Sequence, residues 1–220
     1  MIKITISIVV FDADGTIFDS MPLYTELFSS ILEKEYQIPV ADSSSYYTSS
    51  AGMPLNKQLE AILVKHRKPL DMIQHMADEF FNNAAKKIPD VFPDVMSALK
   101  ELSDYKIIIS TGTRQDILDK RVKCHKLNKY LDKWFGINGF KRKEDHFNEI
   151  KKLYSTSEKG FRESVAFVGD GKPDMELAQK FGIIGIGRIG TTDARGLKKA
   201  GARYTVNTLL EIKGILKSEK

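Results

Sequence analysis

The chain has 220 residues, 42% of them hydrophobic, and a formal net charge of +5. This length can bury a sizeable core, and it suits one domain of about 150 residues with an insertion, or two small domains. No apolar run reaches about 18 residues, so we expect no membrane span, and the single cysteine, Cys124, excludes an intramolecular disulfide. The apolar run at residues 4–11 is too short for a signal peptide, so we expect a cytoplasmic protein.

The first predicted elements are a strand and a group of helices. The run ITISIVVF, residues 4–11, is short, continuous and β-branched, which predicts a buried strand. From residue 21 to about residue 87, leucines recur at a spacing of four, which predicts amphipathic helices. Residues 40–54, VADSSSYYTSSAGMP, are rich in serine and tyrosine, and we predict a long loop there.

Strands and helices alternate after residue 89. Pro89 and Pro93 precede a predicted helix that carries Val95 and Leu99. Further strands are predicted at residues 106–110, 134–137, 164–169, 183–187 and 203–206, and helices at residues 114–126, 146–154, 173–181 and 208–216. This alternation with apolar strands predicts a parallel α/β sheet. The helical block is then an insertion, so we predict a core domain of residues 1–19 and 90–220 and a helical domain of residues 20–89.

Polar side chains follow the predicted strands at the edge where ligands bind in open parallel sheets, beyond the carboxyl ends. They are Asp12 and Asp14 after the first strand, Ser110, Thr111 and Gly112 after the second, the basic run Lys141, Arg142 and Lys143 after the third, and Asp170 and Asp174 after the fourth. Four converging carboxylates repel one another unless a hard cation lies among them, and carboxylates are natural Mg²⁺ ligands. A lysine and a hydroxyl opposite them would stabilise phosphoryl oxygens. One aspartate would attack phosphorus while another handles the proton of the leaving group.

Three motifs carry a family resemblance. DADGT (residues 12–16), IIISTG (107–112) and GDGKPD (169–174) resemble the first, second and fourth motifs of the haloacid dehalogenase-like (HAD) superfamily. MPLNKQL (53–59) and VFPDVMSALKELSDYKIIIST (91–111) are similar to the small cap and the return to the core in its phosphoglycolate phosphatase-like branch. The resemblance covers nearly the whole chain and implies a Rossmann-like parallel-sheet core with an inserted α-helical cap domain that closes over the substrate.

The resemblance also implies roles for individual residues. Asp12 would be the nucleophile that forms an aspartyl-phosphate, and Asp14 the general acid and base. The implied ligands of Mg²⁺ are Asp12, the backbone carbonyl of Asp14, Asp170 and Asp174, and the implied phosphate-binding groups are Thr111, the N–H of Gly112, and Lys143. A second acid at Asp14 distinguishes the phosphatases and mutases of the family from its ATPases and its dehalogenases.

Two assignments keep an alternative. Ser110 competes with Thr111, which we prefer because its hydroxyl aligns with the strand-end position of the second motif. Lys141 competes with Lys143, which we prefer because KEDH, residues 143–146, at the start of a helix resembles the K-x-x-H form of the family's third motif. Asp19 is interpreted as a turn or cap residue outside the chemistry.

The sequence therefore predicts a Mg²⁺-dependent phosphatase that hydrolyses a small phosphorylated metabolite and acts as a monomer or homodimer. One alternative is a phosphomutase of the same fold, similar to β-phosphoglucomutase. Another is a non-catalytic protein that binds a phosphorylated ligand or nucleic acid. The presence of Asp12, Asp14, Lys143 and Asp170 argues against lost catalysis. Nucleic acid is disfavoured because the sequence has no basic stripe interleaved with aromatic residues.

Overall fold

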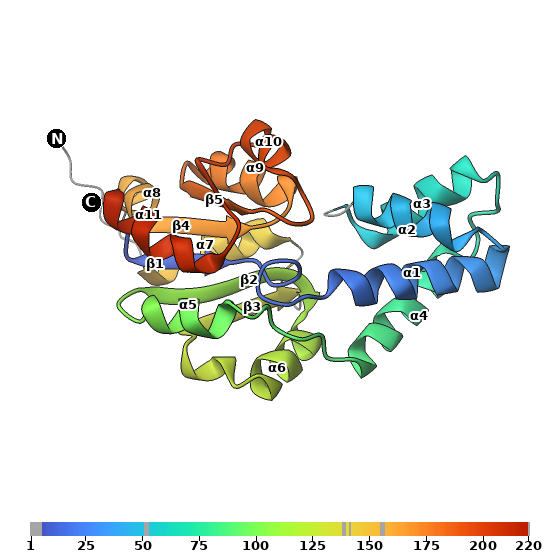
Figure 1. Cartoon of the computed structure of the whole chain (residues 1–220), viewed down its shortest axis with the longest axis horizontal. Coiled ribbons are helices and arrows are strands. Elements are labelled where there is room, and N and C mark those ends of the chain that lie inside the picture. The colour runs from blue at the N-terminus through green and yellow to red at the C-terminus, as the bar shows by residue number, and fades with distance from the viewer. Residues whose placement is uncertain (1–5, 51–52, 138–139, 141, 155–156, 220) are drawn as a thin grey trace. The chain divides into compact units, whose positions relative to one another are not determined.

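The computed structural model describes residues 6–50, 53–137, 140, 142–154 and 157–219. The contacts between residues divide the chain into two compact units (Figure 1). The sheet unit consists of Met1–Asp19 and Val91–Lys220, and the helical unit consists of Ser20–Asp90. No helix of the described residues is both long and apolar enough to cross a membrane.

The sheet unit is built on a single sheet of six strands. The strands are β1 (Ile8–Phe11), β2 (Lys106–Arg114), β3 (Lys133–Ile137), β4 (Val165–Gly169), β5 (Ile184–Arg188) and β6 (Tyr204–Val206). Their order is β3-β2-β1-β4-β5-β6, and every neighbouring pair is parallel. The predicted Rossmann-like parallel core is therefore confirmed. The central strand β1 lies between β2 and β4, which places the ends of these three strands side by side.

Helices cover both faces of the sheet (Figure 1). The helical elements of this unit are α5 (Val95–Glu101), α6 (Gln115–Cys124), η1 (Leu127–Lys129), α7 (Lys143–Tyr154), α8 (Glu158–Ser164), α9 (Lys172–Phe181), α10 (Ala194–Lys199), η2 (Leu209–Glu211) and α11 (Ile212–Ser218). Side chains alternate between the faces of a strand. Val9 and Phe11 accordingly pack with residues of α5, α6 and α11, while Ile8 and Val10 pack with residues of α7, α8 and α9.

The helical unit contains α1 (Met21–Tyr36), α2 (Val40–Ser49), α3 (Leu55–Lys65) and α4 (Ile73–Lys86). Its helices share a core of their own. The core residues are Leu27, Phe28, Ile31, Leu32, Ile38, Tyr47, Leu59, Ile62, Leu63, Met76, Ala77, Phe80 and Ala84. The helices predicted from the leucine spacing are thus present, and each buries one apolar stripe in this core.

The predicted long loop at residues 40–54 is wrong, because Val40–Ser49 forms α2. Serine favours loops since its hydroxyl competes for backbone groups. In α2 this competition is harmless, because Ser43 Oγ donates to the carbonyl of Pro39 one turn back, at 3.1 Å. Ser43 and Tyr47, four residues apart, are buried together, so packing outweighs the local preference. Residues 51 and 52 of the stretch lie outside the described residues.

The second predicted strand is longer than expected. We expected it to end near Ser110, but β2 continues to Arg114, which pairs with Ile137 of β3. The register of this pairing shifts between Ser110 and Arg114. Thr111, Gly112 and Thr113 therefore belong to the strand, and their side-chain positions alternate between its faces.

Candidate active site

The loop after β1 is held in one conformation by backbone contacts. The Asp12 N–H donates to the carbonyl of Val168 on β4 at 2.8 Å, and the Phe18 N–H donates to the carbonyl of Ala13 at 2.8 Å. Gly15 has φ of +79°, a conformation that L side chains rarely adopt. A Cβ on Gly15 would also collide with the carboxylate of Asp170. Glycine is therefore required here for two separate reasons.

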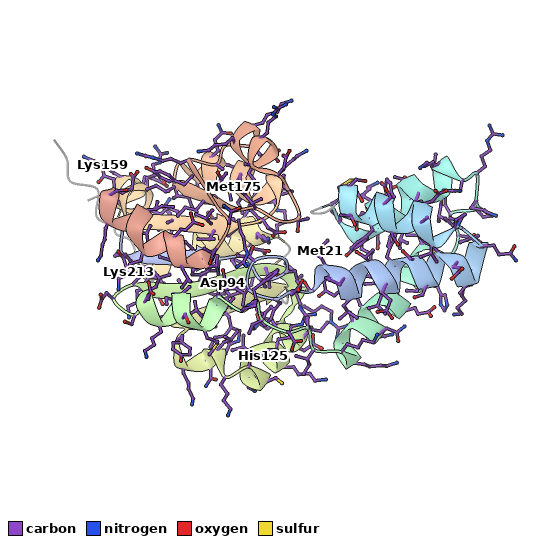
Figure 2. All side chains as sticks on the ribbon, in the orientation of Figure 1. Met21, Asp94, His125, Lys159, Met175 and Lys213 are labelled. Atoms are coloured by element: carbon purple, nitrogen blue, oxygen red, sulfur yellow. The ribbon has the colours of Figure 1, made fainter. Side chains whose placement is uncertain are left out.

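Arg188 holds the same loop from β5. Its Nη1 donates to the carbonyl of Thr16 at 3.1 Å, and its Nη2 donates to Oδ1 of Asp94 at 3.1 Å. Asp94 directly precedes α5 (Figure 2). The other oxygen of Asp94, Oδ2, accepts from the hydroxyl of Thr208 at 2.8 Å. Arg188 is almost fully buried, so these bonds form with little competition from water. The loop that carries Asp14 is thus tied to β5 and α5.

Three buried carboxylates lie together at the carboxyl ends of β1 and β4. Asp12 follows β1, Asp170 follows β4, and Asp174 lies in the first turn of α9. One oxygen from each lies within 4.8 Å of the others, and each residue is at most 5% exposed. Thr16 Oγ1 donates to Oδ1 of Asp170 at 3.2 Å, and the N–H of Gly171 donates to Oδ2 of Asp174 at 3.1 Å. The structure thus brings together three of the four aspartates that were expected to converge.

Lys143 brings one positive charge into this acidic cluster. It is the first residue of α7, and its Nζ lies 2.5 Å from Oδ1 of Asp12 and 2.7 Å from Oδ1 of Asp174. Burial by itself lowers the pKa of Lys143, but the two carboxylates outweigh burial and raise it above its usual range. The side chain is therefore a permanent cation. Lys141, the alternative to Lys143, lies outside the described residues.

The cluster keeps an excess of negative charge. Three carboxylates against one ammonium group leave two negative charges when all are ionised. Burial, and then the charge of Asp174, raise the pKa of Asp170 to about 6. Burial and the neighbouring carboxylates also raise the pKa of Asp12, against the lowering effect of Lys143. A divalent cation would balance this charge, and buried carboxylate oxygens are suitable ligands for it.

The side chain of Asp14 binds a different set of groups. Its Oδ1 accepts from Nη1 of Arg121 on α6 at 2.9 Å, and its Oδ2 accepts from Oγ1 of Thr113 on β2 at 2.5 Å. The reasoning from charge placed all four aspartates around one cation, and among the described residues the carboxylate of Asp14 is not part of that group. Coordination through the backbone carbonyl of Asp14 remains a prediction.

The two hydroxyl candidates on β2 have different surroundings. Ser110 Oγ shares a buried hydrogen bond of 3.0 Å with Nδ1 of His146 on α7. Thr111 Oγ1 accepts from the N–H of Thr113 at 3.2 Å, and Thr111 is 2% exposed. A Cβ on Gly112 would meet nothing within 4 Å, so its backbone lies beside open space. Ser110 is therefore occupied in the packing of α7, on the side of β2 opposite to Thr111.

Arg121 and Thr113 were missed by the reasoning from sequence. The buried residues of α6 are Ile117, Leu118, Arg121 and Val122, so Arg121 occupies a position of the apolar stripe. A charged residue at such a position was the available signal, because arginine is seldom fully buried without a partner. Thr113 is two residues beyond Thr111 and lies on the same face of the strand. It could have been identified only once β2 was known to continue past Thr111.

Comparison with known proteins shows the family to which the chain belongs. A family model described as "Haloacid dehalogenase-like hydrolase" matches residues 9–187, most of the chain. The chain belongs to the haloacid dehalogenase-like hydrolase family. The matched region begins in β1 and ends in β5, so it contains every residue of the acidic cluster together with Lys143. The resemblance noted from the three motifs is therefore confirmed.

Individual relatives cover nearly the whole chain. A protein named "Putative pyrophosphatase PpaX", from Caldanaerobacter subterraneus subsp. tengcongensis, is 24% identical over 96% of this chain and 95% of its own length. A haloacid dehalogenase-like family hydrolase from Streptococcus pneumoniae superposes with a TM-score of 0.82 at 21% identity, covering 96% of this chain and 98% of its own. A structure titled "putative beta-phosphoglucomutase", from Thermotoga maritima, gives a TM-score of 0.67 at 24% identity, covering 97% and 99%. Both structures show the same fold.

Proposed function

We propose that this HAD-family hydrolase is a Mg²⁺-dependent phosphatase that hydrolyses a small phosphomonoester through an aspartyl-phosphate on Asp12. The observation that carries the proposal is the contact of Asp12 with Lys143, inside a group of buried carboxylates with excess negative charge. A nucleophilic carboxylate needs a cationic partner that also attracts the phosphoryl oxygens, and Lys143 can serve both. Cytoplasmic location, and action as a monomer or homodimer, remain expectations.

The acidic cluster fits a magnesium ion. Asp12, Asp170 and Asp174 would hold it, because their oxygens are close together, buried and only partly neutralised by Lys143. When bound, the ion would supply positive charge to the phosphoryl oxygens. Thr111 and the N–H of Gly112 are proposed to bind the phosphoryl group from the end of β2.

In the first step, an oxygen of Asp12 forms a bond to phosphorus while the bond from phosphorus to the leaving oxygen breaks. The protonated carboxyl group of Asp14 gives its proton to that leaving oxygen, so an alcohol departs. In the second step, Asp14 takes a proton from water as the water oxygen attacks phosphorus. The bond between phosphorus and Asp12 then breaks, which releases phosphate and restores both aspartates.

The test is turnover of a phosphate panel by the full chain. The panel comprises p-nitrophenyl phosphate, aliphatic phosphomonoesters, and inorganic pyrophosphate, which the name of the relative PpaX suggests including. We expect phosphate release with Mg²⁺ and none with EDTA. Asp12→Asn should abolish release, whereas Asp19→Asn, which changes a nearby exposed aspartate, should keep full activity. Metal-independent turnover, or full activity of Asp12→Asn, contradicts the proposal.

Other outcomes identify the alternatives. Formation of an isomer in the presence of a bisphosphate primer, without free phosphate, would indicate a phosphomutase. No turnover of any substrate, with binding of a phosphorylated ligand, would indicate a non-catalytic protein. Binding of nucleic acid that weakens steeply with salt would point to the net positive charge as the functional feature. A phosphoenzyme that hydroxylamine cleaves would support the aspartyl-phosphate directly.

A further inference from the structure

Arg121 is the largest of the fully buried side chains in the described residues, with a side chain 1% exposed. It lies on α6 in the same stripe as Ile117, Leu118 and Val122, which pack in the core of the sheet unit. Burying a guanidinium group is costly unless its charge is paired and hydrogen-bonded. A leucine or methionine at this position would serve packing alone. The role of Arg121 must therefore be sought in the group that its guanidinium charge contacts.

The guanidinium group of Arg121 forms an ion pair with the carboxylate of Asp14. Nη1 donates to Oδ1 at 2.9 Å, while the hydroxyl of Thr113 donates to Oδ2 at 2.5 Å. Each carboxylate oxygen thus has its own donor, from two different elements of the sheet unit. A carboxylate has about four acceptor sites, so accepting these two hydrogen bonds is compatible with Asp14 also carrying a proton.

Arg121 also contacts the loop that carries Asp14. Its guanidinium carbon lies 5.6 Å from the centre of the Phe18 ring, a favourable cation–π distance. Phe18 is fully buried, and its carbonyl accepts from the N–H of Gly15 at 2.9 Å. The one side chain therefore touches both ends of the short loop, the carboxylate at its start and the ring at its end.

We propose that Arg121 and Thr113 are positioning residues that hold the carboxylate of Asp14 in the orientation needed for proton transfer to the leaving group. The inference rests on the proposed phosphatase function. Proton transfer requires the donor within hydrogen-bond reach of the leaving oxygen, and a free carboxylate samples several rotamers. Two donors on two elements restrict both side-chain torsions of Asp14. The proton still comes from Asp14, so Arg121 and Thr113 act only through it.

The experiment compares kcat/KM for two substrates. Glycerol 3-phosphate is an alkyl ester, and p-nitrophenyl phosphate is an aryl ester. For each substrate, kcat/KM reports the steps up to departure of the leaving group. The nitrophenolate leaves without needing a proton, so the aryl ester does not depend on proton transfer from Asp14. We expect Arg121→Met and Thr113→Val to lower kcat/KM for the alkyl ester by about tenfold or more, and for the aryl ester by less than about threefold. Arg121→Lys and Thr113→Ser should recover part of the loss for the alkyl ester.

Two controls separate positioning from general loosening. Val122→Ala removes packing from the same stripe of α6, and it should affect both esters equally. Arg114→Met removes an exposed arginine that is paired with Asp116 near the end of β2. This substitution should leave kcat/KM unchanged for both esters. Circular dichroism verifies folding of each variant. If Arg121→Met does not fold, Thr113→Val, which keeps the shape of the side chain, decides the question.

The inference is overturned if the folded variants lose the same factor on both esters, or if Val122→Ala shows the same difference between them. Wild-type protein that turns over neither ester and forms no phosphoenzyme would instead overturn the proposed function, and this inference with it. Wild-type turnover of both esters, with unchanged discrimination in Arg121→Met and Thr113→Val, would overturn the positioning role alone.

Discussion

The ammonium nitrogen of Lys143 lies 2.5 Å from Oδ1 of Asp12, although 131 residues separate them in the chain. The parallel sheet explains the contact. Asp12 follows the central strand β1, and Lys143 begins α7, which packs on the face of the sheet that contains Ile8 and Val10. The same nitrogen contacts Asp174, so one cation links the end of β1 to the start of α9.

Replacing Lys143 by methionine should remove most of the phosphatase activity. The expected loss in kcat with p-nitrophenyl phosphate is about 100-fold or more, because a preorganised charge near the phosphoryl group is lost. Without the cation, the carboxylates of Asp12 and Asp174 repel each other, so we expect the free energy of unfolding in EDTA to fall by about 2 kcal/mol. Urea unfolding and steady-state kinetics measure both effects.

Lys141→Met is the matched comparison for this experiment, since Lys141 was the alternative from the sequence. It should keep wild-type kcat and stability. A large loss in Lys141→Met, together with normal activity in Lys143→Met, would reverse the assignment.

Replacing Gly15 by alanine should damage both stability and activity. The residue has φ of +79°, and the added Cβ collides with the carboxylate of Asp170. The strain at positive φ costs about 1–2 kcal/mol, and displacement of Asp170 should lower kcat by about tenfold or more. Gly190→Ala is the control, because a Cβ there meets nothing within 4 Å and should change the stability by less than about 0.5 kcal/mol. Equal effects of the two substitutions would contradict the prediction.

Substitutions of Ser110 and Thr111 should separate a packing role from phosphate binding. Thr111→Ala is expected to lower kcat/KM by about tenfold or more, because a donor to the phosphoryl group is lost. Ser110→Ala is expected to keep kcat/KM but to lower the free energy of unfolding by about 1 kcal/mol, since it breaks the buried bond to His146. Steady-state kinetics and thermal unfolding of the two variants show which residue binds phosphate and which one has a packing role. The opposite pattern would make Ser110 the phosphate-binding residue.

His146 should make the stability of the sheet unit depend on pH. Burial, and to a smaller extent the charge of Lys143, lower the pKa of His146 to about 4, against the opposing effects of Gly136 and Asp145. The unfolded histidine, with its usual pKa of about 6.5, binds a proton more readily than the folded one. Between these two values the unfolded state takes up more protons, so acidification favours unfolding. The contribution of His146 is complete above about pH 6.5 and is lost as the pH falls toward about 4.

Comparison with His146→Gln isolates this effect. The pKa of Asp170 is raised to about 6, so Asp170 changes the stability in the opposite direction over part of the same pH range. Because Asp170 is present in both proteins, its effect cancels in the comparison. The difference in unfolding free energy between wild type and His146→Gln should shrink by about 2 kcal/mol from about pH 7 to about pH 4.5. Urea unfolding at several pH values measures it. A difference that does not change with pH would mean that His146 titrates normally.

The local sequence pattern was sufficient to predict the parallel sheet and the position of the acidic cluster. Asp12 and Asp170 follow buried apolar strands, and Asp174 lies in the first turn of a helix whose start is marked by Pro173. Because parallel strands in one sheet end at a common edge, chain order alone predicts that these carboxylates meet there. The three motifs supplied the family, and their spacing within each strand–loop–helix unit is short enough to be visible in the sequence.

Only the tertiary packing decided the helix α2 and the contacts of Thr113 and Arg121 with Asp14. The serine-rich residues of α2 have weak helical preference by themselves, and the helix forms because Ser43 and Tyr47 are buried against their neighbours. Thr113 and Arg121 lie 99 and 107 residues from Asp14, and no local pattern connects them to it. Their contact depends on how far β2 extends and on which face of α6 packs inward. Both are consequences of the core, where burial of apolar area outweighs the preferences of single residues.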